Sequence, residues 1–275
     1  MLSKDASLLA GVGIVALLWG ASPALAQTAG AAESFAIVGG QAVNANGTGS
    51  TVDGDVGINP AAATFITGFP ANATITPPFS NHGNDAVAIS ASAASLTLFN
   101  SPEMAPAGGL VIGADLSISG PTADGVYPPG KYFVETGTAL LPNDSFMTLR
   151  GAGTYVFTVN SDLTANTGSS IVLEEGADAC DVWWRVPTQA TLNGGSFVGT
   201  IVSNALIALG SSATLTGRAL NTANGSVTLA GFNTIGGCSV PLVVVPTLPQ
   251  VFMLLLALGL TAAGYLRLRR RAQTE

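Results

Sequence analysis

Charged side chains are scarce in this chain. They make up 9% of its 275 residues, against about 25% in an ordinary globular protein. There is one histidine, His82, and there are two cysteines, Cys180 and Cys238. Because catalysis requires several titratable groups to converge on one place, this composition predicts no catalytic residues and no enzyme. Two cysteines cannot by themselves supply the four ligands of a structural zinc site, and Asp53-Gly54-Asp55 lacks the further acids of a calcium loop. We therefore expect no metal site and no cofactor.

Positive charge is rarer still between the two ends of the chain. Residues 27–240 hold four basic residues against fourteen acidic ones, a net charge of −10. Such a surface repels the phosphates of nucleic acids and offers no basic patch to bind them. Nucleic acid is therefore excluded as a partner.

The first 26 residues have the three parts of a secretory signal peptide. Lys4 gives a weak positive start, Leu8 to Trp19 are apolar apart from glycines, and Ala24-Leu25-Ala26 fits a cleavage site. Residues 1–26 are therefore predicted to be removed on export, leaving Gln27 first. The alternative is an uncleaved anchor, although the apolar run is short for a bilayer.

The C-terminal end has a different pattern. Residues 251–268 are almost wholly apolar and lead into the basic residues 269–275, which include Arg269-Arg270-Arg271. A helix of 18 residues is about 27 Å long, close to the hydrocarbon thickness of a bilayer. Because arginine clusters stay on the cytoplasmic side, we predict a transmembrane helix with the rest of the chain outside and a short cytoplasmic tail.

Residues 239–250 form the linker that precedes this apolar stretch. Valines there lead into a motif made of Pro246, Thr247, Leu248 and Pro249. Motif, apolar helix and arginines together resemble the IPTL-CTERM sorting tail of Gram-negative bacteria, with Val245 where that family usually has isoleucine. The resemblance implies an exosortase-like processing enzyme as a partner, cleavage near the motif, and delivery to the cell envelope or surface with release as one outcome. A permanent single-pass membrane anchor is the alternative.

The middle of the chain alternates short apolar clusters with turns rich in Gly, Asn, Asp and Ser. Strands of four to six residues bounded by such turns predict an all-β fold. Leu163, Leu192 and Leu215 each lie between small polar residues, at spacings of 29 and 23 residues. Near-repeats of this length indicate the stacked coils of a β-solenoid.

One segment departs from the β pattern. Residues from about 84 to 100 are rich in alanine, with Asp85 or Asn84 as a cap and Pro102 beyond the end. Four apolar residues follow the spacing of one helix face: Val87, Ala91, Ala94 and Leu98. This spacing predicts an α-helix packed along the solenoid. Its Ser-x-Ser alternation leaves a strand as the alternative.

Residues 34–235 resemble the ice-binding protein family. The resemblance is carried by FAIVGGQAVNANGTGSTVDGDVGINP near the start, then by ITGFP and GKYF. The most specific part is the order Ala-Cys-x-Val-x-Trp, Phe-Val-Gly-Thr-Ile and Gly-Arg-Ala-Leu near the end. It implies a right-handed discontinuous β-solenoid domain over residues 34–238 with one helix alongside, and an ice crystal surface as the partner.

Threonine explains how such a domain could bind ice. It offers a methyl and a hydroxyl on a side chain with few rotamers, and strands about 4.7–4.9 Å apart would set equivalent threonines in a ladder. If the three leucines point inward, their neighbours point outward. The predicted ice-binding residues are therefore Thr164, Thr191, Asn193, Thr214 and Thr216, with Asp162 as a flaw in the ladder. Outward threonines on a different face of the solenoid are the alternative.

Two further expectations remain open. An exported protein permits a disulfide between Cys180 and Cys238, two free thiols being the alternative. A surface adhesin or matrix protein that binds polysaccharide or a protein partner, without ice activity, is the alternative function. It depends on Trp183 and Trp184, of which strand alternation would bury one and expose the other.

Overall fold

The computed structural model describes residues 27–240. The predicted signal segment, sorting motif, apolar span and basic tail lie outside these residues. Within residues 27–240, no helix is long and apolar enough to cross a membrane.

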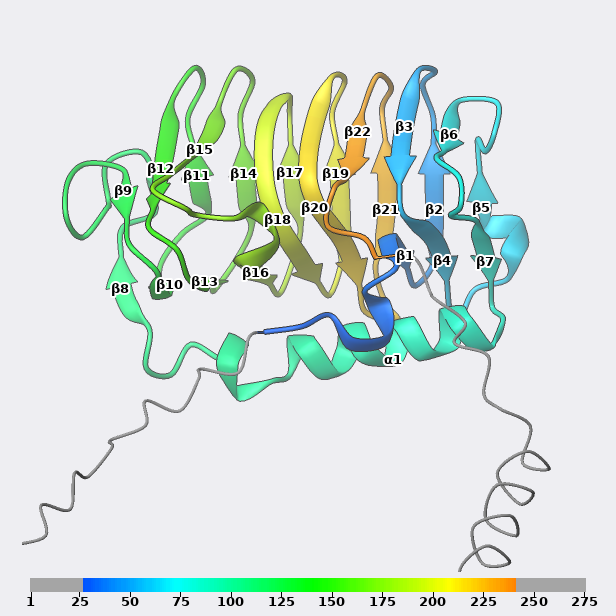
Figure 1. Cartoon of the computed structure of the whole chain (residues 1–275), viewed down its shortest axis with the longest axis horizontal. Coiled ribbons are helices and arrows are strands. Elements are labelled where there is room, and N and C mark those ends of the chain that lie inside the picture. The colour runs from blue at the N-terminus through cyan, green and yellow to red at the C-terminus, as the bar shows by residue number, and fades with distance from the viewer. Residues whose placement is uncertain (1–26, 241–275) are drawn as a thin grey trace, which may run out of the picture.

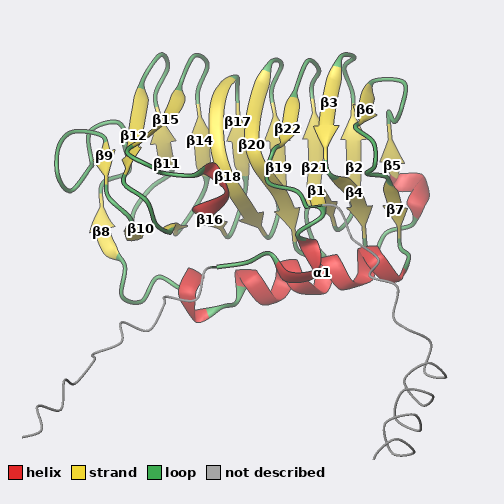
Figure 2. Ribbon diagram, viewed as in Figure 1, coloured by secondary structure: helices red, strands yellow, loops and turns green. Residues whose placement is uncertain are grey.

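Parallel strands stack into a long solenoid with one helix along its side (Figures 1 and 2). All the pairings between its named strands are parallel, as successive coils of a solenoid require. The seven-stranded sheet consists, in spatial order, of β11 (Ala139–Leu141), β14 (Leu163–Ala165), β17 (Ala190–Leu192), β19 (Leu206–Leu209), β21 (Ser226–Leu229), β2 (Ala42–Ala45) and β5 (Ile66–Thr67).

The fifteen-stranded sheet is divided into two rows of strands, which we call the front row and the helix-side row. Two long strands run through both rows and join them. These are β18 (Gly195–Ser203) and β20 (Ala213–Asn221). The front row joins their first halves to β9 (Val126–Tyr127), β12 (Phe146–Arg150), β15 (Ser170–Glu174), β22 (Thr234–Gly236), β3 (Ser50–Asp53) and β6 (Ala73–Ile75). The helix-side row joins their second halves to β8 (Leu110–Ile112), β10 (Gly130–Val134), β13 (Tyr155–Val159), β16 (Val182–Val186), β1 (Phe35–Gly39), β4 (Asp55–Ile58) and β7 (Asn81–Gly83).

The change from one row to the other takes place at a pair of glycines. Gly199 and Gly217 are partners in the middle of β18 and β20, and both have positive φ, 105° and 154°. A Cβ on Gly217 would lie 2.0 Å from the carbonyl oxygen of Gly199. Glycine is therefore required here by both the backbone conformation and the close approach of the two strands.

The spatial order of the strands is discontinuous with the sequence. β2 pairs with β21, and β1 pairs with β20, so the N-terminal coils stack on the C-terminal ones (Figure 1). Sequence neighbours alone therefore do not identify the strands that lie side by side.

The predicted helix is confirmed as α1 (Ala86–Phe99). The carboxylate of Asp85 accepts hydrogen bonds from the backbone N–H groups of Val87 (3.0 Å) and Ala88 (2.9 Å), which caps its N-terminus. The four residues expected on one face all belong to the apolar cluster that joins the helix to the helix-side row and to the N-terminal segment. Four short 3₁₀ helices complete the secondary structure: η1 (Gly30–Ala32), η2 (Ala63–Phe65), η3 (Pro102–Met104) and η4 (Ala179–Asp181).

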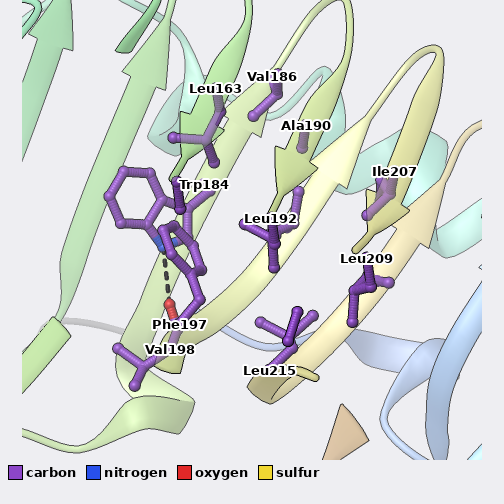
Figure 3. Close-up of a cluster of buried hydrophobic side chains, with 14 of the residues drawn as sticks. Leu163, Trp184, Val186, Ala190, Leu192, Phe197, Val198, Ile207, Leu209 and Leu215 are labelled. Carbon is purple, nitrogen blue, oxygen red and sulfur yellow. Dashed lines mark hydrogen bonds between the residues drawn. The ribbon is translucent and has the colours of Figure 1, made fainter. Parts of the chain in front are cut away.

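Large side chains fill the interior of the solenoid (Figure 3). The ring of Trp184 stacks on Phe157 at a centroid distance of 4.3 Å, and its indole N–H donates to the carbonyl of Val198 at 3.0 Å. Trp183 points to the other side of the same strand, yet it is only 1% exposed. The expectation of one exposed tryptophan is wrong, because α1 and the N-terminal segment cover the outer side of this row.

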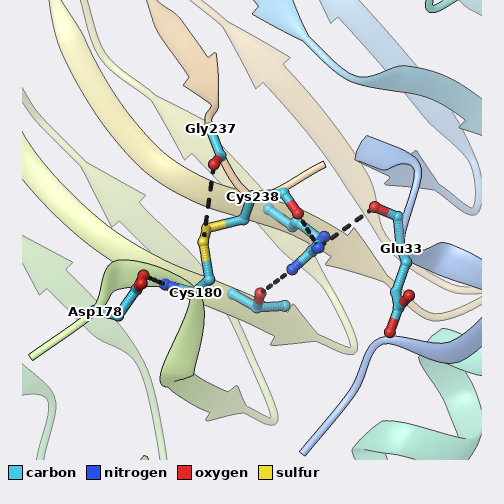
Figure 4. The surroundings of a disulfide bond; sticks show 7 residues. Glu33, Asp178, Cys180, Gly237 and Cys238 are labelled. Carbon is cyan, nitrogen blue, oxygen red and sulfur yellow. Dashed lines mark hydrogen bonds between the residues drawn. A yellow bond between two sulfur atoms is a disulfide. The ribbon is translucent and has the colours of Figure 1, made fainter. Parts of the chain in front are cut away.

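The expected disulfide between Cys180 and Cys238 is confirmed (Figure 4). It joins η4 to the segment after β22, and a closed loop of this length stabilises a fold by about 4 kcal/mol in the chain-entropy model. Beside it, the guanidinium of Arg218 donates to the carbonyls of Cys238 and Glu33 and to the hydroxyl of Thr200. The two ends of the described chain are therefore held together.

Candidate functional site

The residues predicted for a single ladder lie on two different sheets. Thr164 and Thr191 are register partners on β14 and β17, and Asn193 follows β17 with its amide 3.2 Å from Asn166. Thr214 and Thr216 lie on the first half of β20, in the front row. The inward orientation of the three leucines is confirmed, since all are buried.

The prediction of a single ladder is wrong, because Leu163, Leu192 and Leu215 do not occupy equivalent positions in one sheet. Leu192 is the register partner of Leu209 in the seven-stranded sheet, whereas Leu215 is the partner of Phe197 and Ile235 in the front row. Each coil passes through several strands that share one pattern of alternation. A repeat of that pattern therefore does not identify the face to which a strand belongs.

The outer side of the front row carries an unbroken line of hydroxyl side chains, one on each of six neighbouring strands. We call this line the hydroxyl face. In spatial order it consists of Ser170, Ser196, Thr214, Thr234, Thr51 and Thr74. Four of them are exposed, and Ser170 and Thr214 are half-buried. Parallel strands lie about 4.7–4.9 Å apart, so the six side chains repeat at that spacing.

The neighbouring positions on this face are small or apolar, with one exception. Two residues further along five of the six strands lie Val172, Val198, Thr216, Gly236 and Asp53, of which Val198 and Gly236 are buried. The carboxylate of Asp53 is the only charge among them. The hydroxyl face itself therefore has no ionised group, although a carboxylate lies beside Thr51.

The outer side of the seven-stranded sheet is less regular. Its central line, the seven-stranded face, consists of Leu140, Thr164, Thr191, Ala208, Thr228, Asn44 and Thr67. Ala208 and Asn44 interrupt its threonines, and the hydroxyl of Thr67 donates to the amide oxygen of Asn44 at 2.9 Å. Asp162 lies two residues before Thr164, where its carboxylate accepts from the hydroxyl of Thr188 and the N–H of Gln189.

The helix-side row cannot present a flat surface, because α1 covers it. His82 lies at one end of this row, in β7. Its Nδ1 is 2.9 Å from a carboxylate oxygen of Asp85, and its Nε2 is 3.2 Å from the hydroxyl of Ser80. Burial works to raise the pKa of Asp85, but hydrogen bonds from the Ala88 N–H and from His82 hold that pKa below its ordinary value. These contacts join the start of the helix to the solenoid.

Sequence reasoning missed five of the six members of the hydroxyl face, namely Ser170, Ser196, Thr234, Thr51 and Thr74. A signal was present, since Thr51, Thr74 and Thr234 are each followed by a β-branched residue of the sheet. It could not be assembled from the sequence, because β3 and β6 come from the N-terminal part of the chain and stack beyond β22.

Comparison with known proteins agrees with this architecture. Residues 37–235 match the family model described as Ice-binding-like, so the chain belongs to that family. Among curated proteins it is 27% identical over 213 residues to an ice-binding protein of Leucosporidium sp. strain AY30, which covers 70% of this chain and 77% of that protein.

Solved structures show the same fold. An ice-binding protein from an Antarctic biological consortium has 30% identity and a TM-score of 0.66, covering 76% of this chain and 90% of that one. The ice-binding protein of the Antarctic ascomycete Antarctomyces psychrotrophicus has 31% identity and a TM-score of 0.63, covering 76% of this chain and 97% of that one.

Proposed function

We propose that this protein adsorbs to ice through the hydroxyl face and thereby limits ice growth or recrystallisation. The observation that carries the proposal is the register of six hydroxyl side chains on six neighbouring strands. The ice-binding names of its relatives support the choice of ligand.

The chemistry of ice favours such a surface. An ice crystal offers a regular lattice of water and no charge with which to pair. A binding surface therefore needs a fixed spacing, small side chains and few ionised groups, since a charge orients its own hydration shell in an arrangement that does not match the ice lattice. Threonine supplies a hydroxyl and a methyl with restricted χ1, and the strand spacing of about 4.7–4.9 Å is close to a repeat of the ice lattice.

Rigidity is the other requirement. A loose surface would lose conformational entropy on adsorption, which opposes binding. Here five of the six strands of the hydroxyl face pair with a neighbouring strand on both sides, and β6 pairs with β3 alone. The sheet packs on a core that contains stacked aromatic rings. The hydroxyl groups are therefore held in place before they meet ice.

We also propose the route by which the domain reaches its place of action. Residues 1–26 act as a signal peptide, and residues 251–268 hold the exported chain in the membrane by a helix. The motif Pro246 to Pro249 is the site near which an exosortase-like enzyme cuts. The domain then works at the cell surface, or free of it after cleavage.

The direct test uses purified residues 27–240, which include every strand of the solenoid. We expect thermal hysteresis, inhibition of ice recrystallisation, and enrichment of the protein in a slowly growing ice hemisphere. Bovine serum albumin at the same concentration is the control. Ice growth that is the same with this domain as with albumin would overturn the proposal.

A further inference from the structure

The outer side of α1 is apolar although it faces away from the solenoid. Ile89 is 48% exposed and Leu96 is 47% exposed, and Ala86 and Ala93 are exposed beside them. The sequence of the helix, Ala86–Phe99, contains no charged residue. We call this outer side, defined by these four residues, the helix face.

Polar groups on this side of the helix are already satisfied. The hydroxyl of Ser90 donates to the carbonyl of Ala86 at 2.8 Å, and the hydroxyl of Thr97 donates to the carbonyl of Ala93 at 2.9 Å. A hydroxyl that is bonded to its own helix costs less to remove from water than a free one. The helix face is therefore less polar than its composition suggests.

The described chain ends next to this helix. The N–H of Val240 donates to the carbonyl of Glu33 at 2.9 Å, directly after η1, which packs on α1. Gln27 to Gly30 line a cavity together with Ala94 and Leu98 of the helix. Ten residues, 241–250, separate Val240 from the predicted membrane helix, and ten residues reach at most about 35 Å. A membrane anchor would therefore hold Val240, on the side of the domain that carries η1, within about 35 Å of the bilayer.

Charge favours the same orientation. Residues 27–240 carry a net charge of −10, so anionic lipid repels most of the surface. Charged residues on this side of the domain include Asp85 and Glu103 beyond the two ends of the helix and Glu33 directly after η1. Lys131 is bonded to the carbonyls of Pro102 and Ala107, and Arg185 is stacked on Phe99. Lys131 and Arg185 therefore offset part of the acidic charge at this side of the domain.

We infer that, while the C-terminal tail is attached, the helix face lies against the lipid bilayer and the hydroxyl face points away from it. Exposed Ile and Leu side chains on a helix can enter the boundary between lipid headgroups and acyl chains. The orientation leaves the front row free to meet external ice. This inference rests on the proposed membrane anchoring, and it adds the surface that contacts lipid.

The test uses the chain from residue 27 to residue 275 in vesicles of phosphatidylethanolamine and phosphatidylglycerol. Three variants each have one added cysteine: Ala93→Cys, Thr234→Cys or Thr191→Cys. The added cysteine carries an environment-sensitive fluorophore, and spin-labelled lipid headgroups quench its fluorescence. We expect several-fold stronger quenching at position 93 than at 234 or 191. Equal quenching at all three positions, or stronger quenching at 234 or 191, would overturn the inference.

A charged helix face gives a second measurement. Ile89→Glu with Leu96→Glu should reduce quenching at position 93, whereas the matched pair Thr164→Glu with Ala208→Glu should leave it unchanged. Circular dichroism before labelling shows whether each variant folds. If Ile89→Glu with Leu96→Glu does not reduce quenching at position 93, this face does not contact lipid. A change in fluorescence at position 93 that occurs without vesicles would show that a second copy of the chain covers the face, and it would likewise contradict lipid contact.

The anchoring step has its own readout. Flotation on a density gradient shows whether the chain is held by vesicles, and absence from the lipid fraction overturns the inference together with the anchoring proposal. Ice adsorption by residues 27–240 is measured without lipid. Failure of the ice proposal is therefore distinguishable from failure of this one.

Discussion

The hydroxyl face and the seven-stranded face are built from the same residue types, but they differ in continuity. On the hydroxyl face, six neighbouring strands each present a serine or threonine at the same register. On the seven-stranded face, Ala208 and Asn44 separate the threonines into shorter groups. Threonine content alone therefore does not distinguish the two faces, whereas register does.

Continuity matters because each contact with ice is weak. One interruption doubles the spacing between hydroxyl groups on neighbouring strands to about 10 Å. A crystal surface is then contacted by separate patches instead of one line. The comparison predicts that adsorption depends mainly on the front row.

The largest expected effect comes from a bulky side chain in the middle of the hydroxyl face. Thr234→Tyr should remove most of the thermal hysteresis, because the ring holds the neighbouring threonines away from a flat crystal. The matched change on the other sheet, Thr191→Tyr, should keep most of it. Thermal hysteresis and recrystallisation assays on residues 27–240 measure both.

Folding must be the same in the two variants for the comparison to count. Both side chains point out of a strand, so we expect melting temperatures close to that of the unchanged domain. A large loss of thermal hysteresis in Thr191→Tyr with none in Thr234→Tyr would show that ice binds to the seven-stranded sheet. That sheet holds Thr164 and Thr191, two of the residues that the sequence predicted to bind ice.

The helix and the inward leucines could be predicted because their signals are local. Asp85 caps the helix that begins at the next residue, through the N–H of Ala88 three residues further on. Strand alternation buries Leu163, Leu192 and Leu215 wherever their strands lie. The faces could not be predicted, because they depend on pairing across long distances. Thr234 lies beside Thr51, 183 residues earlier in the sequence.

The tryptophan prediction shows the same limit for burial. Alternation correctly places Trp183 and Trp184 on opposite sides of β16, but it carries no information on what packs outside the sheet. Trp183 is buried by α1 and the N-terminal segment. The adhesin alternative thereby loses the exposed ring on which it depended.

An intermediate effect is expected from repairing the seven-stranded face. Ala208→Thr with Asn44→Thr would place threonine on six neighbouring strands, from Thr164 to Thr67. Both positions are half-buried sites on strands, where threonine is favoured. In the background of Thr234→Tyr, this repair should restore part of the lost thermal hysteresis.

The matched control for this repair keeps one interruption. Ala208→Thr with Asn44→Ala, in the same background, should restore clearly less, although it also removes the bond from Thr67. Equal recovery in the two variants would mean that continuity is not what separates the faces.

The smallest expected effect concerns the third side of the solenoid and leaves both ladders unchanged. Asp85→Ala removes the N-terminal cap of α1 and should lower the free energy of unfolding by about 1 kcal/mol. Asp85→Asn, whose amide oxygen can still accept from the helix N–H groups, should lower the free energy of unfolding by less.

The stabilisation by Asp85 should also depend on pH. Because the folded-state pKa of Asp85 lies below its ordinary value, this stabilisation is present above the unfolded-state pKa and is lost as pH falls through the lowered folded-state pKa. The difference in melting temperature between the unchanged domain and Asp85→Ala should therefore narrow in strong acid, while thermal hysteresis at neutral pH stays the same in both. A loss of thermal hysteresis in Asp85→Ala without unfolding would show that the helix takes part in contact with ice.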